Sequence, residues 1–147
     1  MNKDKMKKII RFRSPEKHYT ADACVVWCFD DRFTALLGKL EMLGWKNVDL
    51  VKVAGGAKDL ASGGPGAEFI LDQIDKSVRL HHTKLIALMV HKSCGAYGKL
   101  EVKDEKEFLT GELEKAVARV RELVRSKGYE AEVKAFLADF EALYLVK

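Results

Sequence analysis

Two short, uninterrupted apolar runs constrain the fold of this 147-residue chain more than any other feature. They occupy residues 23–27 and 85–90, are rich in aliphatic side chains, and are too short for typical helices. Such runs predict strands that are buried within a sheet. Each run is followed at once by a polar segment, residues 28–32 after the first and residues 91–95 after the second. We therefore expect two strand ends that carry chemically active groups out of the sheet.

Three potential metal ligands lie in these polar segments. The first segment begins with Cys28, and the second contains His91 and Cys94. Thiolate and imidazole groups are suitable zinc ligands, and three protein ligands leave a tetrahedral ion with one open position. This set predicts a catalytic rather than a structural zinc site; the alternative is two buried cysteines and a core histidine. Cys24, inside the first run, is expected to be a packed core thiol.

Asp30 and Arg32 follow Cys28 closely enough to act at the same site. Arg32 can hold the Asp30 carboxylate ionised through a bidentate pair, and Asp30 can then accept a hydrogen bond from zinc-bound water. The carboxylate could instead bind zinc and close the site, or the two residues could form a structural ion pair. We predict that Asp30 and Arg32 are catalytic and that Asp31 caps the following helix.

Strand and helix patterns alternate from residue 23 to the tail. This alternation predicts an α/β fold with a three-layer, mostly parallel sheet and helices on both faces. Gly44 and Gly128 are expected to end two of the helices. The tail forms either one closing strand or two strands joined as a hairpin. The predicted strands are residues 23–27, 48–53, 85–90, 133–137 and 142–146, and the predicted helices are residues 32–43, 65–78 and 111–127.

The predicted α/β fold would bring the two polar segments close together. In open α/β sheets, ligands bind beyond the carboxyl ends of the strands, where the strand order reverses. If strands 48–53 and 85–90 lie on opposite sides of strand 23–27, then Cys28 and His91 become neighbours. The glycine-rich segment 55–66 lacks the order of a nucleotide-binding loop and is expected to form a tight crossover near the same pocket.

Composition and charge narrow the class of protein. The chain is 48% hydrophobic and 33% charged, which is typical of a folded domain, and its net charge is only +4. Much of the positive charge lies in residues 1–20, which we expect to be a solvated basic arm, or a short helix, outside a single domain of residues 21–147. No run has the pattern of a signal peptide or the length of a membrane span, so we expect a cytoplasmic protein that binds neither membranes nor nucleic acid. Three cysteines argue against a disulfide framework.

Taken together, these motifs resemble those of the β-class carbonic anhydrases. The resemblance rests on Cys28-x-Asp30-x-Arg32 and His91-x-x-Cys94-Gly95, each at the end of a predicted buried strand. Residues 52–56 also resemble a conserved Arg-Asn-Ala-Gly-Asn stretch of that family. The similarity covers residues 21–98 well and the remainder only through the order of elements. Asp31, Lys52 and Val90 depart from the residues that many members carry at these positions.

The resemblance implies a zinc lyase that interconverts carbon dioxide and bicarbonate by attack of a zinc-bound hydroxide. It also implies a strand order of 2-1-3-4, one zinc ion per chain held by Cys28, His91 and Cys94, and a catalytic dyad of Asp30 and Arg32. Members of the family form homodimers or larger homo-oligomers with the active site near the subunit interface. Relatives that hydrolyse carbonyl sulfide or carbon disulfide provide a second candidate function, and a catalytically silent zinc domain provides a third.

Overall fold

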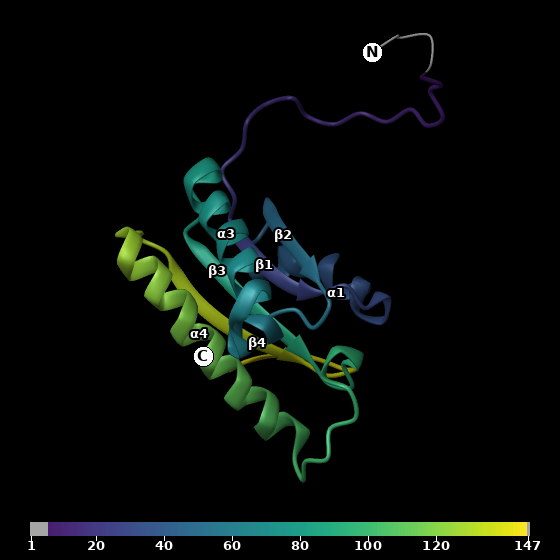
Figure 1. The fold of residues 1–147 in the computed structure, drawn as a ribbon. Coiled ribbons are helices and arrows are strands. Elements are labelled where there is room, and N and C mark those ends of the chain that lie inside the picture. The colour runs from purple at the N-terminus through teal and green to yellow at the C-terminus, as the bar shows by residue number, and fades with distance from the viewer. Residues whose placement is uncertain (1–5, 147) are drawn as a thin grey trace.

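The computed structural model describes residues 6–146, which are built around one five-stranded sheet (Figure 1). The strand order is β2-β1-β3-β4-β5, so β1 has β2 on one side and β3 on the other, as predicted. The first four strands are parallel, whereas β5 pairs antiparallel with β4 and forms the hairpin alternative for the tail. The strands are β1 (Ala23–Cys28), β2 (Val48–Val53), β3 (Leu85–His91), β4 (Glu132–Ala138) and β5 (Leu143–Leu145).

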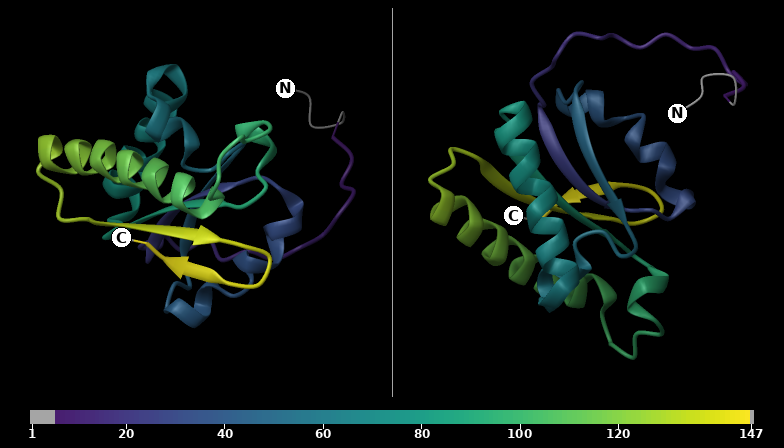
Figure 2. Two further views of the ribbon diagram at one scale, coloured as in Figure 1. Left: turned by 90° about the horizontal axis from the view of Figure 1, so that it is seen from below. Right: turned by 45° about the horizontal axis from the view of Figure 1, so that its top comes forward.

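Helices cover both faces of this sheet and give the predicted three layers (Figure 2). One face carries α2 (Lys58–Ser62), α3 (Gly64–His81) and α4 (Glu105–Lys127). The opposite face carries α1 (Thr34–Leu37) between the short 3-10 helices η2 (Asp31–Phe33) and η3 (Leu40–Leu43). The α/β class, the sheet order and the two helical layers are therefore confirmed.

The side chains of β1 show why its apolar run is continuous. Cys24 and Val26 pack into the core beneath α2, α3 and α4, whereas Val25 and Trp27 pack into the core on the α1 side. Successive residues of a strand point to opposite faces, so a strand covered on both faces needs apolar residues at every position. All four side chains are fully buried, and Cys24 is the core thiol that the sequence predicts.

The helix predicted for residues 32–43 is broken into three short pieces. The α-helical part is limited to Thr34–Leu37, and η2 and η3 flank it. Gly38, which follows α1, lowers the helical propensity at the point where the break occurs. The predicted end is correct, because Gly44 adopts the left-handed conformation and closes η3.

Helix α4 begins earlier than the predicted residue 111. The side chain of Asp104 accepts a hydrogen bond from the Glu107 N–H and caps the helix, which then starts at Glu105. Helix α2 was not predicted from the sequence, and it lies in the glycine-rich crossover between β2 and α3. The predicted end at Gly128 is confirmed by its left-handed conformation.

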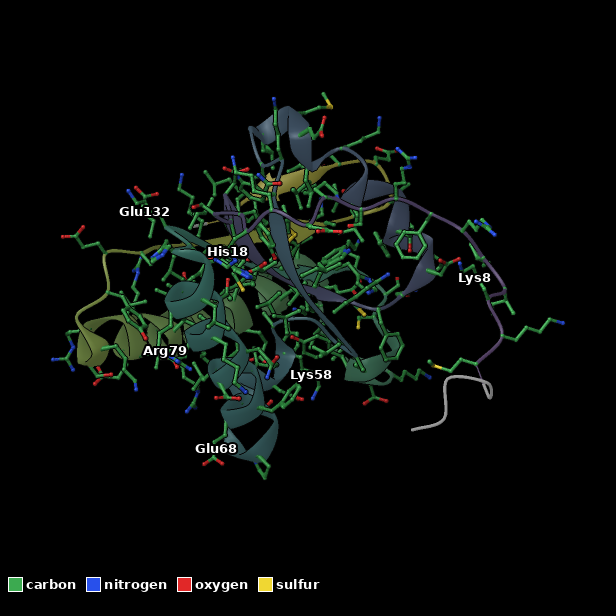
Figure 3. The ribbon with its side chains drawn as sticks, turned by 90° about the horizontal axis from the view of Figure 1, so that it is seen from above. Lys8, His18, Lys58, Glu68, Arg79 and Glu132 are labelled. Atoms are coloured by element: carbon green, nitrogen blue, oxygen red, sulfur yellow. The ribbon has the colours of Figure 1, made fainter. Side chains whose placement is uncertain are left out.

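Residues 6–20 form an extended arm with neither helix nor strand, and the chain runs along it away from the sheet (Figure 1). The arm is exposed throughout. Lys8 stands far from the domain, whereas His18 lies against it and contacts the carbonyl oxygen of Leu80 (Figure 3). The remaining part of the predicted arm, residues 1–5, lies outside the described residues. Within residues 6–146, no helix is both long enough and apolar enough to cross a bilayer.

Candidate metal centre

Cys28, His91 and Cys94 converge at the carboxyl ends of β1 and β3. These parallel strands are neighbours, so the last residue of each emerges at the same edge of the sheet. One potential ligand atom from each residue lies within 4.8 Å of the others, and all three side chains are buried. The predicted meeting of the two polar segments is therefore confirmed, and these residues form a group that could hold a metal ion.

The separation of the two thiols matches ligands that share one ion. The Cys28 and Cys94 Sγ atoms are 3.9 Å apart, which is far longer than a disulfide bond of about 2.05 Å. Two sulfurs bound tetrahedrally to one zinc at about 2.3 Å are separated by about 3.8 Å. The thiols are thus spaced as two ligands of one ion would be, and both are free cysteines.

The imidazole of His91 is fixed in the orientation that a metal ligand needs. Its Nδ1 lies 2.7 Å from the carbonyl oxygen of Lys92, so Nδ1 carries the proton and donates it to that oxygen. The Nε2 atom is buried and has no hydrogen-bond partner, as is also true of Trp27 Nε1 and the Tyr97 hydroxyl among the described residues. An unpaired Nε2 lone pair that faces two thiols is the arrangement found in metal sites with a backbone acceptor behind the histidine.

Burial affects the protonation of the imidazole and of one thiol in this cluster. Burial lowers the pKa of His91, which keeps the ring neutral and able to coordinate metal. Burial, followed by the proximity of Cys28, raises the pKa of the Cys94 thiol. A divalent cation between the thiols would reverse this effect by stabilising both thiolates. The donor set therefore fits a thiophilic ion such as zinc.

Asp30 and Arg32 form the pair that the sequence predicts. The Nη2 group of Arg32 donates to Asp30 Oδ2 at 2.7 Å, and its Nε donates toward both carboxylate oxygens at 3.1 Å. The backbone N–H of Arg32 donates to Oδ1 at 3.0 Å. These donors, chiefly the Arg32 side chain, lower the pKa of Asp30 to about 2. Asp30 Oδ2 lies 3.8 Å from His91 Nε2, so the carboxylate borders the cluster.

Asp30, rather than Asp31, is the helix cap at this strand end. The Asp30 carboxylate accepts from the Arg32 N–H at the start of η2, whereas Asp31 accepts a hydrogen bond from the Thr34 hydroxyl. The prediction for Asp31 was wrong because the helical segment begins at Asp31 itself, one residue before the predicted start at residue 32.

The turn between His91 and Cys94 contains two contacts that the sequence did not indicate. Ser93 adopts a left-handed conformation with φ of 57°. Its N–H donates to the Glu105 carboxylate at 2.6 Å, and its carbonyl oxygen accepts from Arg32 Nη2 at 3.0 Å. The turn thus joins the start of α4 to the Asp30–Arg32 pair. A serine in this conformation is uncommon, and no periodicity in the sequence marks it.

The turn after β2 closes against the same strand ends. Gly56 has φ of +58°, and a Cβ atom there would lie 2.4 Å from the Met89 carbonyl oxygen and 3.1 Å from the Cys28 nitrogen. The Ala57 N–H donates to the same Met89 oxygen. Glycine is required because the backbone approaches both β1 and β3 too closely for a side chain. The crossover predicted for this segment is confirmed.

An open pocket of about 630 Å³ leads to the two thiols. Its walls come from the segments that follow β1, β2 and β3, and they are mainly apolar apart from two carboxylates. The lining residues are Cys28, Phe29, Asp30, Asp31, Ala54, Gly55, Cys94, Gly95 and Ala96.

A family model described as "Putative carbonic anhydrase" matches residues 18–141, which include the whole cluster. The chain belongs to this family, and the resemblance drawn from its motifs is confirmed. No curated protein sequence matches the chain significantly.

Solved structures with a similar fold include carbonic anhydrases and a carbon disulfide hydrolase. A carbonic anhydrase from Glaciozyma antarctica is 15% identical with a TM-score of 0.59, over 88% of this chain and 84% of that one. One of two tetrameric β-carbonic anhydrases from Sordaria macrospora is 16% identical with a TM-score of 0.58, over 86% of this chain and 81% of that one. The apo form of a carbon disulfide hydrolase is 13% identical with a TM-score of 0.52, over 86% of this chain and 79% of that one. At these identities the likeness is one of fold.

Proposed function

We propose that this chain is a β-class carbonic anhydrase that interconverts carbon dioxide and bicarbonate with one zinc ion per chain. The observation that carries the proposal is the buried Cys28, His91 and Cys94 cluster with an ionised carboxylate beside it, at the carboxyl edge of the sheet. Membership in the family supports the same assignment.

Cys28, His91 and Cys94 would hold the ion, and two of them, Cys28 and Cys94, line the pocket. Zinc, when bound, supplies a Lewis acid that makes a coordinated water a stronger acid. Two thiolates and a neutral imidazole balance the charge of the dication, so this acidification is weaker than with three histidines. We therefore expect activity to rise toward alkaline pH.

Asp30 would orient the nucleophile by accepting a hydrogen bond from it. Its depressed pKa keeps it ionised across the neutral range, when it acts only as an acceptor. Arg32 occupies both carboxylate oxygens, which weakens Asp30 as a competing metal ligand and fixes its direction. Asp30 Oδ2 lies 3.8 Å from His91 Nε2, so the carboxylate is close enough to the cluster for this role.

The pocket walls suit a small, uncharged substrate. Phe29, Ala54 and Ala96 contribute apolar surface beside the thiols, and no cationic side chain lines the described part of the pocket. Carbon dioxide can enter such a site without losing strong hydration, whereas bicarbonate gains no ion pair that would retain it. These features favour the conversion of carbon dioxide into bicarbonate and the release of the charged bicarbonate.

Stopped-flow hydration of carbon dioxide on zinc-loaded protein tests this function. We expect a rate above that of buffer between pH 7 and pH 9, with loss of activity after removal of zinc by a chelator and recovery after its return. No rate above buffer in metal-replete protein would refute the proposal.

The fold shared with a carbon disulfide hydrolase supports a second candidate. Carbonyl sulfide and carbon disulfide are also linear and uncharged, so the same pocket could admit them. Release of sulfide from either gas, without hydration of carbon dioxide, would favour this function. Bound zinc without turnover of any of the three substrates would leave a catalytically silent zinc-binding domain.

We further propose that the protein is a homo-oligomer located in the cytoplasm. The tetrameric relatives from Sordaria macrospora support self-association. The arm supports it too, because Ile9, Ile10 and Phe12 are each more than 70% exposed on a segment that makes little contact with its own domain. Apolar side chains displayed in this way commonly mark a protein contact.

A further inference from the structure

A stack of three rings connects His91 to the turn between β4 and β5. The His91 and Phe33 ring centroids are 4.2 Å apart with an interplanar angle of 31°, and the Phe33 and Phe140 centroids are 5.2 Å apart at 35°. Phe33 is buried, whereas Phe140 is 61% exposed. The stack therefore runs from the buried cluster to a surface turn that lies more than forty residues further along the chain.

Arg32 lies against both phenylalanines of this stack. Its Cζ atom is 5.3 Å from the Phe140 centroid and 5.8 Å from the Phe33 centroid. Guanidinium groups at this distance from an aromatic face are attracted to it. The Arg32 side chain is 51% exposed, and its hydrogen bonds to Asp30 and to the Ser93 carbonyl oxygen are open to competition from water. The two rings restrict its rotameric freedom further and shield its pair with Asp30.

The turn that carries Phe140 is itself held rigidly by Asp139. One carboxylate oxygen accepts from the N–H groups of Glu141 and Ala142 at 2.9 and 2.8 Å. The other accepts from Lys106 Nζ at 3.1 Å and from the Tyr144 hydroxyl at 3.0 Å. Because Lys106 belongs to α4 and Tyr144 to β5, the turn is anchored to two elements, and Phe140 is presented from a fixed support.

We infer that Phe140 is a positioning residue that holds the Arg32 guanidinium, and through it the Asp30 carboxylate, in place beside the metal cluster. Phe140 does not line the pocket, so it acts through Arg32 rather than on the substrate. The kinetic consequence of this inference rests on the proposed function, whereas the structural consequence does not. An exposed phenylalanine in a tight turn contributes little to the core, so its contacts with Phe33 and Arg32 are the physical account of its position.

Solvent exchange of the Arg32 Nε–H proton, followed by ¹⁵N NMR, tests the structural consequence without any turnover. The resonance is assigned by its loss in Arg32→Lys. We expect exchange about 2- to 5-fold faster in Phe140→Ala, little change in Phe140→Tyr, and an intermediate rate in Phe140→Leu, which keeps apolar volume but lacks the aromatic face. Phe69→Ala, at a similarly exposed phenylalanine on α3, should leave the exchange unchanged. Unchanged exchange in a folded Phe140→Ala or Phe140→Leu protein would overturn the inference.

A double-mutant cycle tests the kinetic consequence. Phe140→Ala should lower kcat for carbon dioxide hydration by about 3-fold in the otherwise native protein, with KM little changed, and by much less in an Asp30→Asn background, because residues that act through one another are not additive. An equal loss in both backgrounds would contradict the inference. If the native protein shows no turnover, the proposed function fails, whereas the exchange measurement still decides the role of Phe140.

Discussion

The Sγ atoms of Cys28 and Cys94 lie 3.9 Å apart although 66 residues separate them in the chain. The imidazole nitrogen beside them is buried without a hydrogen-bond partner, which is costly to a domain, and a cation bound to this nitrogen and to both sulfurs would remove that cost. The relationship gives Cys28 and Cys94 a role that the third cysteine, Cys24, does not share, because Cys24 is packed in the apolar core.

Removal of one ligand should abolish metal retention. We expect Cys28→Ser to lose the one zinc per chain after dialysis and to lower the thermal midpoint, because metal binding contributes to the stability of the folded state. Cys24→Ala provides the matched control, since this buried thiol belongs to the core and lies outside the cluster. It should cost about 1 kcal/mol of stability and retain zinc. Metal analysis of both variants checks the assignment, and full zinc content in Cys28→Ser would contradict it.

Replacement of Asp30 should separate catalysis from metal binding. Asp30→Asn removes the ionised acceptor but keeps the shape of the side chain, so kcat should fall about 100-fold or more while zinc is retained. The neighbouring Asp31→Asn is the control, because Asp31 bonds to Thr34 at the pocket rim. Its rate should stay within about 3-fold of the native value. Stopped-flow kinetics and metal analysis measure both effects, and native turnover in Asp30→Asn would remove this residue from the mechanism.

Gly56 should tolerate no side chain. In Gly56→Ala the new Cβ meets the Met89 carbonyl at 2.4 Å and the φ of +58° is unfavourable, so we expect a loss of about 3 kcal/mol or more in the free energy of unfolding. Gly128→Ala carries the same backbone penalty at φ of +67° but has nothing within 4 Å of its Cβ. Its cost should be about 1 kcal/mol. Urea denaturation measures the difference, and equal losses would show that the close approach to β1 and β3 is unimportant.

Stability should fall in acid. Hydrogen bonds from the Glu141 and Ala142 N–H groups, together with Lys106, lower the pKa of Asp139, and Arg32 lowers that of Asp30 to about 2. A carboxyl group whose pKa is lowered by folding stabilises the protein above its unfolded pKa of about 4, and this contribution is lost as the pH falls toward the folded value.

Chemical denaturation at pH 6 and pH 3 measures this dependence. Asp139→Asn should lose less stability between the two pH values than the native protein does, because it lacks the titrating group. Glu101→Gln, at an exposed site, should behave like the native chain. A native-like slope in Asp139→Asn would mean that the turn is not held by its carboxylate.

The arm should contribute to self-association. Replacement of Ile9, Ile10 and Phe12 by serine removes exposed apolar surface and keeps the basic residues. If these side chains contact a second copy, the variant should show a smaller mass than the native oligomer by size-exclusion chromatography with light scattering. Conversion of Lys7 and Lys8 to glutamine is the control and should leave the mass unchanged. An identical mass in the serine variant would place the interface elsewhere.

Much of the architecture is encoded locally. The continuous apolar runs at residues 23–27 and 85–90 predict strands buried on both faces, and the positions of β1 and β3 follow directly from them. The identity of the candidate metal donors is also local, because a thiol or imidazole at the end of a buried strand has few uses other than packing or coordination. Gly44 and Gly128 mark helix ends because helices commonly end at one residue in the left-handed conformation, which glycine adopts most easily.

Only the tertiary structure decided how the site is supported. Nothing near Arg32 in the sequence indicates that its guanidinium contacts Phe140, or that Glu105 holds the turn at Ser93, because these contacts depend on where β4, β5 and α4 pack. Sequence patterns thus determined which groups are present and on which strands, since these follow from local propensity and burial. Long-range packing determined their distances and orientations, which no local pattern encodes.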